Sequence, residues 1–221
     1  MNPNITIVAA AALLVTLPSC GSSAPPRGRA AAAPVGPAAA AEAAPYRMSG
    51  AALMMTPDQV RSALEADGYR WKPNDHGTDL MPPFDVQVEE RITGKAVAHP
   101  TDEPHIQPWT KGRETLRVTY GAFPDGPRAV WYHWETEDPS PSADEIQATL
   151  AKRYGAGWRL KLFLPPMWCS PMPCSDASAK LMAVGRQIDL TAPVALSGDH
   201  FDYERIEAAA RARQGDKHGS F

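Results

Sequence analysis

The chain has few cysteines, little net charge and none of the common catalytic motifs. Its 221 residues include three cysteines and give a formal net charge of −3. Lysines and arginines never cluster beyond an adjacent pair, which argues against a nucleic-acid partner. There is no G-x-S-x-G, P-loop, dinucleotide-binding or H-E-x-x-H motif, so the sequence names no reaction and predicts no cofactor.

Long apolar runs are also scarce. The clearest is Ile5–Leu17, whose thirteen residues are too few to span a bilayer but match the apolar region of a signal peptide. It leads into Leu17-Pro18-Ser19-Cys20, which resembles the lipobox of bacterial lipoproteins. The resemblance implies a signal peptide at 1–19, cleavage before Cys20 and a lipid on that cysteine. Gly21, and not Asp, follows the cysteine, which in this family implies the outer membrane, with the protein facing the periplasm.

Two alternatives to this signal stay open. An ordinary secretory signal would be cut elsewhere, and the absence of Lys and Arg from the first four residues allows a start further upstream. Residues 20–46 carry the cysteine and then a stretch rich in Ala, Pro and Gly. Such a composition buries too little surface to fold, so we predict a disordered tether. No second apolar run approaches membrane-spanning length, and the lipid is therefore the expected membrane contact.

The other two cysteines, Cys169 and Cys174, form a CSPMPC segment. If Cys20 carries the lipid, two cysteines are left, and in an oxidising compartment such a pair predicts a disulfide. Closing so short a loop stabilises a fold by about 2 kcal/mol in the chain-entropy treatment, so its expected role is to pin one Pro-rich loop. A metal pair would lack two ligands, and a redox dithiol normally has C-x-x-C spacing.

Residues 47–213 are predicted to form a single α+β domain, followed by a frayed tail at 214–221. Two helices within it share one plan. Thr56 and Ser142 each stand three residues before a Gln or Glu, the spacing of a capping box. The helices stop at Gly68 and Gly155. This likeness predicts two similar halves, 54–138 and 139–213, each a helix followed by strands, although any two capped helices would show it.

Alternating apolar and polar side chains predict the strands. The clearest pair is 115–123 against 128–135, joined by a Pro-Asp-Gly turn. That turn pairs Tyr120 with Val130, Val118 with Tyr132 and Leu116 with Trp134. The order of elements implies an α+β fold: an antiparallel sheet of about six or seven strands with helices on one face. Further strands are expected at 84–88, 158–164, 180–184, 187–190 and 194–196, and a last helix at 202–213.

The segment MTPDQVRSAL and the helix-then-strands order resemble the small SmpA/OmlA-type envelope lipoproteins and the β-lactamase-inhibitor-protein-like fold. Members of both groups contain a helix-then-sheet unit, tandem in the inhibitor proteins, and bind other proteins. The resemblance implies a binding module, and it carries no binding residue over to this chain. It does not explain the segment 93–113.

One segment has the residue types of a metal site. His99, Asp102, Glu103 and His105 lie together in a Pro-rich stretch that we predict to be a loop. Imidazoles and carboxylates are suitable ligands for a divalent ion. The spacing matches no established site, however, and such loops commonly contain these residues without a role. No metal is therefore assigned, and a metal-binding or hydrolytic protein using this loop is the alternative function.

The predicted hairpin supplies a candidate binding face. Arg117, Trp131 and His133 share its more polar side. If helices cover only the other side, Trp131 is exposed beside Arg117, a composition typical of interaction hot spots. If both sides are covered, Trp131 is an ordinary core residue. We therefore predict a non-catalytic, lipid-anchored envelope module that binds another protein.

Overall fold

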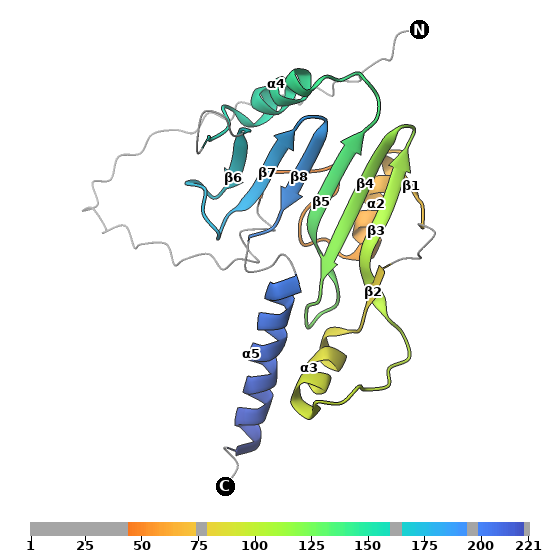
Figure 1. Cartoon of the computed structure of the whole chain (residues 1–221), viewed down its shortest axis with the longest axis vertical. Coiled ribbons are helices and arrows are strands. Elements are labelled where there is room, and N and C mark those ends of the chain that lie inside the picture. The colour runs from red at the N-terminus through yellow and green to blue at the C-terminus, as the bar shows by residue number, and fades with distance from the viewer. Residues whose placement is uncertain (1–43, 74–78, 160–164, 194–198, 219–221) are drawn as a thin grey trace, which may run out of the picture. The chain divides into compact units, whose positions relative to one another are not determined.

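The computed structural model describes residues 44–73, 79–159, 165–193 and 199–218, which all lie in one compact unit, Val35–Phe221 (Figure 1). Cys20 and most of the predicted tether lie outside the described residues. The elements follow the order α2 (Pro57–Ala66), β1 (Arg70–Trp71), β2 (Asp79–Met81), α3 (Phe84–Thr93), β3 (Glu103–Lys111), β4 (Glu114–Gly121), β5 (Arg128–Thr136), α4 (Ala143–Tyr154), β6 (Met167–Ser170), β7 (Ala179–Val184), β8 (Gln187–Thr191) and α5 (Asp199–His218).

The strands form one antiparallel sheet, so the α+β prediction is confirmed. The sheet has eight strands in the order β1-β3-β4-β5-β8-β7-β6, with β2 also paired to β3. The sequence predicted six or seven. Two three-stranded meanders, β3-β4-β5 and β6-β7-β8, therefore meet at the β5–β8 pair. Each follows a capped helix, but β1, β2 and α3 have no counterpart among the described residues of the later half, and the duplication stays a prediction.

Both predicted capping boxes are present. The Gln59 backbone N–H donates to the Thr56 hydroxyl, and the Gln59 side chain accepts from the Thr56 backbone N–H at 2.9 Å. Ser142 and Glu145 exchange the equivalent bonds at the start of α4. These contacts satisfy backbone N–H groups that a helix leaves without internal partners, which explains why both helices begin where the sequence indicates.

The predicted hairpin is confirmed as β4 and β5, with one change of register. Leu116 pairs with Trp134 and Val118 with Tyr132, as expected, but Tyr120 lies opposite Ala129, so its predicted pairing with Val130 is wrong. The ladder shifts between Thr119 and Tyr120, as in a β-bulge. The cause is tertiary: the Ala129 backbone hydrogen-bonds to Met54 and Met55, and the Val130 carbonyl accepts from Ala192.

Residues 84–88 form the start of helix α3, so their prediction as a strand is wrong. Phe84 and Val88 are both buried, and their separation of four residues places them on one helical face. Val86 is an additional apolar residue between these two buried positions. It makes the helical segment look like the alternating pattern of a strand. Gly94 ends it in the left-handed conformation at φ 66°.

The predicted loop around His105 is also wrong from Glu103 onward, because Glu103–Lys111 is strand β3. Its prolines fit because of the direction in which their missing N–H groups would point. In an antiparallel strand the N–H and C=O of one residue point to the same side. The Pro108 carbonyl accepts from Lys72 on the β1 side, so the missing donor faces the short edge strand and not β4.

The remaining strand predictions are mixed. β7 and β8 match the strands expected at 180–184 and 187–190. The predicted strand 194–196 and residues 160–164 of the one at 158–164 lie outside the described residues. Helix α5 is longer than expected, running from Asp199 to His218, and it packs along α3 (Figure 1). Arg91 of α3 pairs with Glu207, and Asp85 with Arg213.

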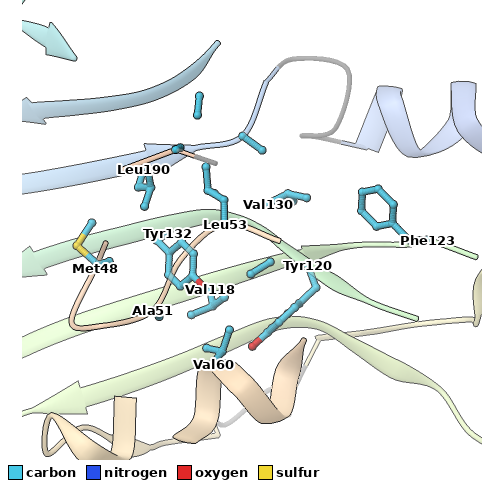
Figure 2. Packing of buried hydrophobic residues seen from close by; sticks show 14 of the residues in the cluster. Met48, Ala51, Leu53, Val60, Val118, Tyr120, Phe123, Val130, Tyr132 and Leu190 are labelled. Carbon is cyan, nitrogen blue, oxygen red and sulfur yellow. The ribbon is translucent and has the colours of Figure 1, made fainter. Parts of the chain in front are cut away.

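The core lies on one face of the sheet. Helix α2 and the segment 44–55 pack there, with Val60 directed towards Tyr120 and Val118 (Figure 2). Helix α4 joins the same side, because the indole N–H of Trp168, a buried sheet residue, donates to the Gly155 carbonyl at 2.8 Å. The prediction of helices on one face thus holds for α2 and α4. The opposite face of the central strands is not covered by these two helices, and it is the candidate site.

Candidate binding face

The side of the sheet opposite α2 carries a mixed set of polar and apolar side chains. We call it the open face, because no helix among the described residues covers it (Figure 1). Strand registers place its residues in rows across the sheet. The central positions are Pro108, Thr110, Thr115, Arg117, Thr119, Trp131, His133, Glu135, Asp189, Thr191, Lys180 and Met182.

Trp131 is the large apolar residue at the middle of this face. It is 40 % exposed, whereas its neighbours Val130 and Tyr132 are almost completely buried on the other side. Strand alternation alone produces this contrast, because successive side chains point to opposite faces. Of the two expected environments for Trp131, the structure shows the exposed one.

One carboxylate holds Trp131 in place. The indole N–H donates to Oδ1 of Asp189 at 2.9 Å, and Nδ1 of His133 lies 2.8 Å from the same oxygen. The Trp131 and His133 rings also contact each other at 67°, with centroids 6.0 Å apart. Asp189 reaches both rings because β8 pairs with β5 and places it directly opposite His133. The exposed indole is therefore fixed before any partner arrives.

His133 lies between two carboxylates. Its Nδ1 faces Asp189, and its Nε2 lies 3.8 Å from an oxygen of Glu135. A carboxylate at Nδ1 favours the tautomer that carries its proton there, which leaves Nε2 as the acceptor in the neutral ring. A His–Asp pair can orient a base for a nucleophile. The residues paired with His133 on the neighbouring strands are Arg117 and Asp189, however. Neither has a hydroxyl or thiol that His133 could activate.

A hollow of about 390 Å³ lies at the end of the open face nearest the β3–β4 and β7–β8 turns. Its lining is polar and carries both signs of charge. A hollow of this composition suits a charged side chain better than an apolar ligand, because its polar groups would remain unpaired against hydrocarbon. The lining residues are Arg113, Thr115, Glu135, Thr136, Glu137, Val184, Gly185, Arg186 and Gln187.

Three of the four residues suggested as metal ligands lie in two separate ion pairs, one of which is completed by Asp79. Nε2 of His99 lies 2.7 Å from Asp102, and Nδ1 of His105 lies 3.3 Å from Asp79. The hydrogen bond to Asp102 raises the pKa of His99, with a smaller contribution from the Val97 carbonyl. Across the described ranges, no group of three or more His, Cys, Asp or Glu side chains is arranged to hold a metal ion.

Glu103, the fourth suggested ligand, has a different environment. One of its carboxylate oxygens is buried without a hydrogen-bond partner, and burial raises its pKa. It lies in β3 opposite Met81. The two histidines, Asp102 and Glu103 therefore do not converge on one point.

The predicted disulfide between Cys169 and Cys174 is present. It closes the turn that follows β6, the last strand of the sheet. The buried hydroxyl of Ser178 supports this turn by donating to the Pro171 carbonyl at 2.7 Å. The bond thus pins a loop at the sheet edge, away from Trp131.

Sequence reasoning found Arg117, Trp131 and His133 but missed Asp189. The only available signal was an acidic residue between two apolar ones, Ile188 and Leu190, in a short predicted strand. It also missed a polar network on the covered face, where Glu114 accepts from the Tyr69 hydroxyl and from the Trp134 indole. Asp189 depends on the pairing of β8 with β5, and the Glu114 network depends on Tyr69, which is 45 residues away along the chain.

Comparison with protein-family models, with curated proteins and with solved structures finds no match for this chain. None of the described helices is long and apolar enough to cross a membrane.

Proposed function

We propose that this chain is a non-catalytic, lipid-anchored protein of the bacterial envelope that binds another protein through its open face. The observation that carries the binding role is Trp131, exposed at the centre of that face and fixed by Asp189. Large, rigid aromatic side chains contribute strongly to protein interfaces because they bury much area at little entropic cost.

Three further features support a binding surface over a catalytic site. The face is broad and formed by strands, with its hollow at one end and not at His133. The His133–Asp189 pair has Arg117, not a nucleophile, on its other side. Trp131 and Arg117 are of residue types that are enriched in protein interfaces, and polar side chains surround them.

The anchor rests on the sequence. The lipobox-like Leu17-Pro18-Ser19-Cys20 follows the apolar run, and the Ala/Pro-rich stretch after it would let the domain work at a distance from the membrane. The tether would end before Ala44 and Tyr46, which are buried in the core. A lipid on Cys20 would place the open face in the periplasm, most consistently at the outer membrane.

Affinity capture from detergent-solubilised envelopes tests the binding role. The bait is the full chain, and its variants are Trp131→Ala and Trp71→Ala. Trp71 is a matched control because it is similarly exposed, at 47 %, but lies in a row of the covered face. We expect a protein that wild type and Trp71→Ala retain and that Trp131→Ala loses. Recovery that is the same for all three baits would refute the sheet-face proposal.

A further inference from the structure

Four basic side chains gather on one half of the open face. We call Arg70, Lys72, Arg113 and Arg117 the basic strip. Arg70 pairs in register with Thr110, and the Lys72 backbone N–H donates to Pro108, which lies opposite Arg117. Arg113 lines the hollow at the β3–β4 turn. All four side chains belong to exposed residues.

The strands that carry the strip have no acidic side chain on the open face, although Arg113 shares the hollow with Glu135 and Glu137. The open-face positions of β1, β3 and β4 are Arg70, Pro104, Ile106, Pro108, Thr110, Thr115, Arg117 and Thr119, and none is acidic. Asp79 of the neighbouring β2 is paired with His105. Among the described residues, no Asp or Glu forms an ion pair with any of the four cations.

Several exposed cations elsewhere on the domain behave differently. Arg61 pairs with Asp58, Lys111 with Asp67, and Arg213 with Asp85. The whole chain is acidic, with a net charge of −3. Arg70 and Lys72 thus lie across β3 from the residues of β4, and Arg117 and Arg113 lie in β4 and just before it. Acidic groups on a partner would complement these four charges.

The neighbouring strands narrow the kind of partner. Next to the strip, β5 and β8 present Trp131, Glu135 and Asp189. A phosphate-bearing surface, whether lipid or nucleic acid, is negatively charged throughout, so part of it would lie against these two carboxylates and be repelled. A polypeptide mixes its groups, and it can place carboxylates on the strip, N–H donors at Glu135 and Asp189, and an apolar group at Trp131.

We propose that the open face binds an acidic segment of its protein partner, with carboxylates on the basic strip and an apolar side chain on Trp131. This inference rests on the proposed function and specifies the chemistry of the partner. Arg117 is the central contact, because it adjoins His133 in register and has Lys72 on the far side of Pro108. A guanidinium can hold a carboxylate through two parallel hydrogen bonds.

The test is a selection from a random 12-residue peptide library on the full chain carrying Cys20→Ser, which removes the lipid. The same selection is run on the double variant Arg70→Glu/Arg117→Glu. We expect peptides rich in Asp and Glu from the first protein and peptides rich in Lys and Arg from the second. Affinity of the acidic peptides should fall at least tenfold in the double variant, and Lys95→Glu/Lys152→Glu, a reversal away from the face, should change it less than twofold.

The other possible results distinguish failure of this inference from failure of the proposed function. Peptides that need Trp131 but show no acidic preference would overturn this inference and leave the proposed function standing. Peptides that depend on neither Trp131 nor the strip would count against both. Phosphatidylglycerol vesicles and a 12-base-pair DNA duplex are tested in parallel, and tighter binding of either through Arg70 and Arg117 would replace the acidic peptide by a phosphate surface. Far-UV circular dichroism confirms that each variant is folded.

Discussion

Asp189 fixes two side chains of the open face with a single oxygen atom. Its role is positional: Trp131 and His133 would each gain rotational freedom if it were removed. Because a hydrogen bond to a carboxylate in a part-exposed site is worth more than an ordinary one but is screened by water, its loss should cost only about 1 kcal/mol. We expect a larger effect on the Trp131 indole, which would no longer be held in one orientation.

We therefore predict that Asp189→Ala lowers the free energy of unfolding by about 1 kcal/mol in urea titrations and weakens the near-ultraviolet circular dichroism of the aromatic side chains. Asp189→Asn retains an oxygen acceptor and should show about half of each effect. Equal values for Ala and wild type would mean that Asp189 does not hold Trp131 in solution.

On the covered face, Leu116 is completely buried beside Trp134 and Trp109. Replacing it with Ala should destabilise the domain by about 3 kcal/mol, because transfer and cavity costs add in a packed core. Val184→Ala, at a residue that is 45 % exposed, is the control and should change stability by less than about 0.5 kcal/mol. Chemical denaturation measures both.

At the scale of elements, the two capping boxes differ in one chemical respect. Gln59 closes the box of α2, whereas Glu145 closes that of α4. Hydrogen bonds from Ser142 lower the pKa of Glu145 below its ordinary 4.5. Because the folded pKa lies below the unfolded one, the stabilisation is complete above about pH 4.5 and is lost as the pH falls through the folded value.

Thr56→Ala should accordingly cost about 1 kcal/mol at both pH 7 and pH 3. Ser142→Ala should destabilise the domain at pH 7 and do so less at pH 3, because Glu145 loses its charge as the pH falls through its lowered pKa. Urea unfolding of the two variants and wild type at both pH values gives the comparison. An unchanged Ser142→Ala effect at pH 3 would show that the carboxylate charge does not contribute to the cap.

These elements also show what local sequence can and cannot determine. The capped helices and the β4–β5 hairpin could be predicted because each is specified by residues close in sequence, such as Thr56 with Gln59. Strand β3 could not, because its two prolines argue for a loop unless the neighbour on each side is known. Helix α3 was missed because Phe84, Val86 and Val88 satisfy two periodicities, and only burial against α5 and the core selects between them.

The open face was only half predictable for the same reason. Successive side chains along β5 point to opposite faces, so Trp131 and His133 lie opposite the core residues. This alternation can be read from the sequence. Asp189 comes from β8, and Arg70, Lys72 and Arg113 of the basic strip come from the segments around β1 and the β3–β4 turn. Their position beside Trp131 depends on the strand order, which no local pattern encodes.

At the scale of the whole molecule, the proposed function combines a lipid anchor, a tether and a binding domain in one chain. Attachment of a lipid to Cys20 can be tested separately. Wild-type protein should sediment with membranes and incorporate labelled palmitate, whereas Cys20→Ser should do neither and remain folded. Label that persists in Cys20→Ser would place the lipid elsewhere, and an unlabelled, secreted wild-type protein would favour the ordinary signal peptide.

The central claim is that the open face meets a protein in the cell. A photo-crosslinking amino acid placed at Thr119 or Met182, on the open face, and at Arg61, on the outer surface of α2, tests it directly in living cells. We predict a discrete higher-mass adduct from the two open-face positions and none from the position of Arg61. Adducts from Arg61 alone, or from none of the three, would contradict the account.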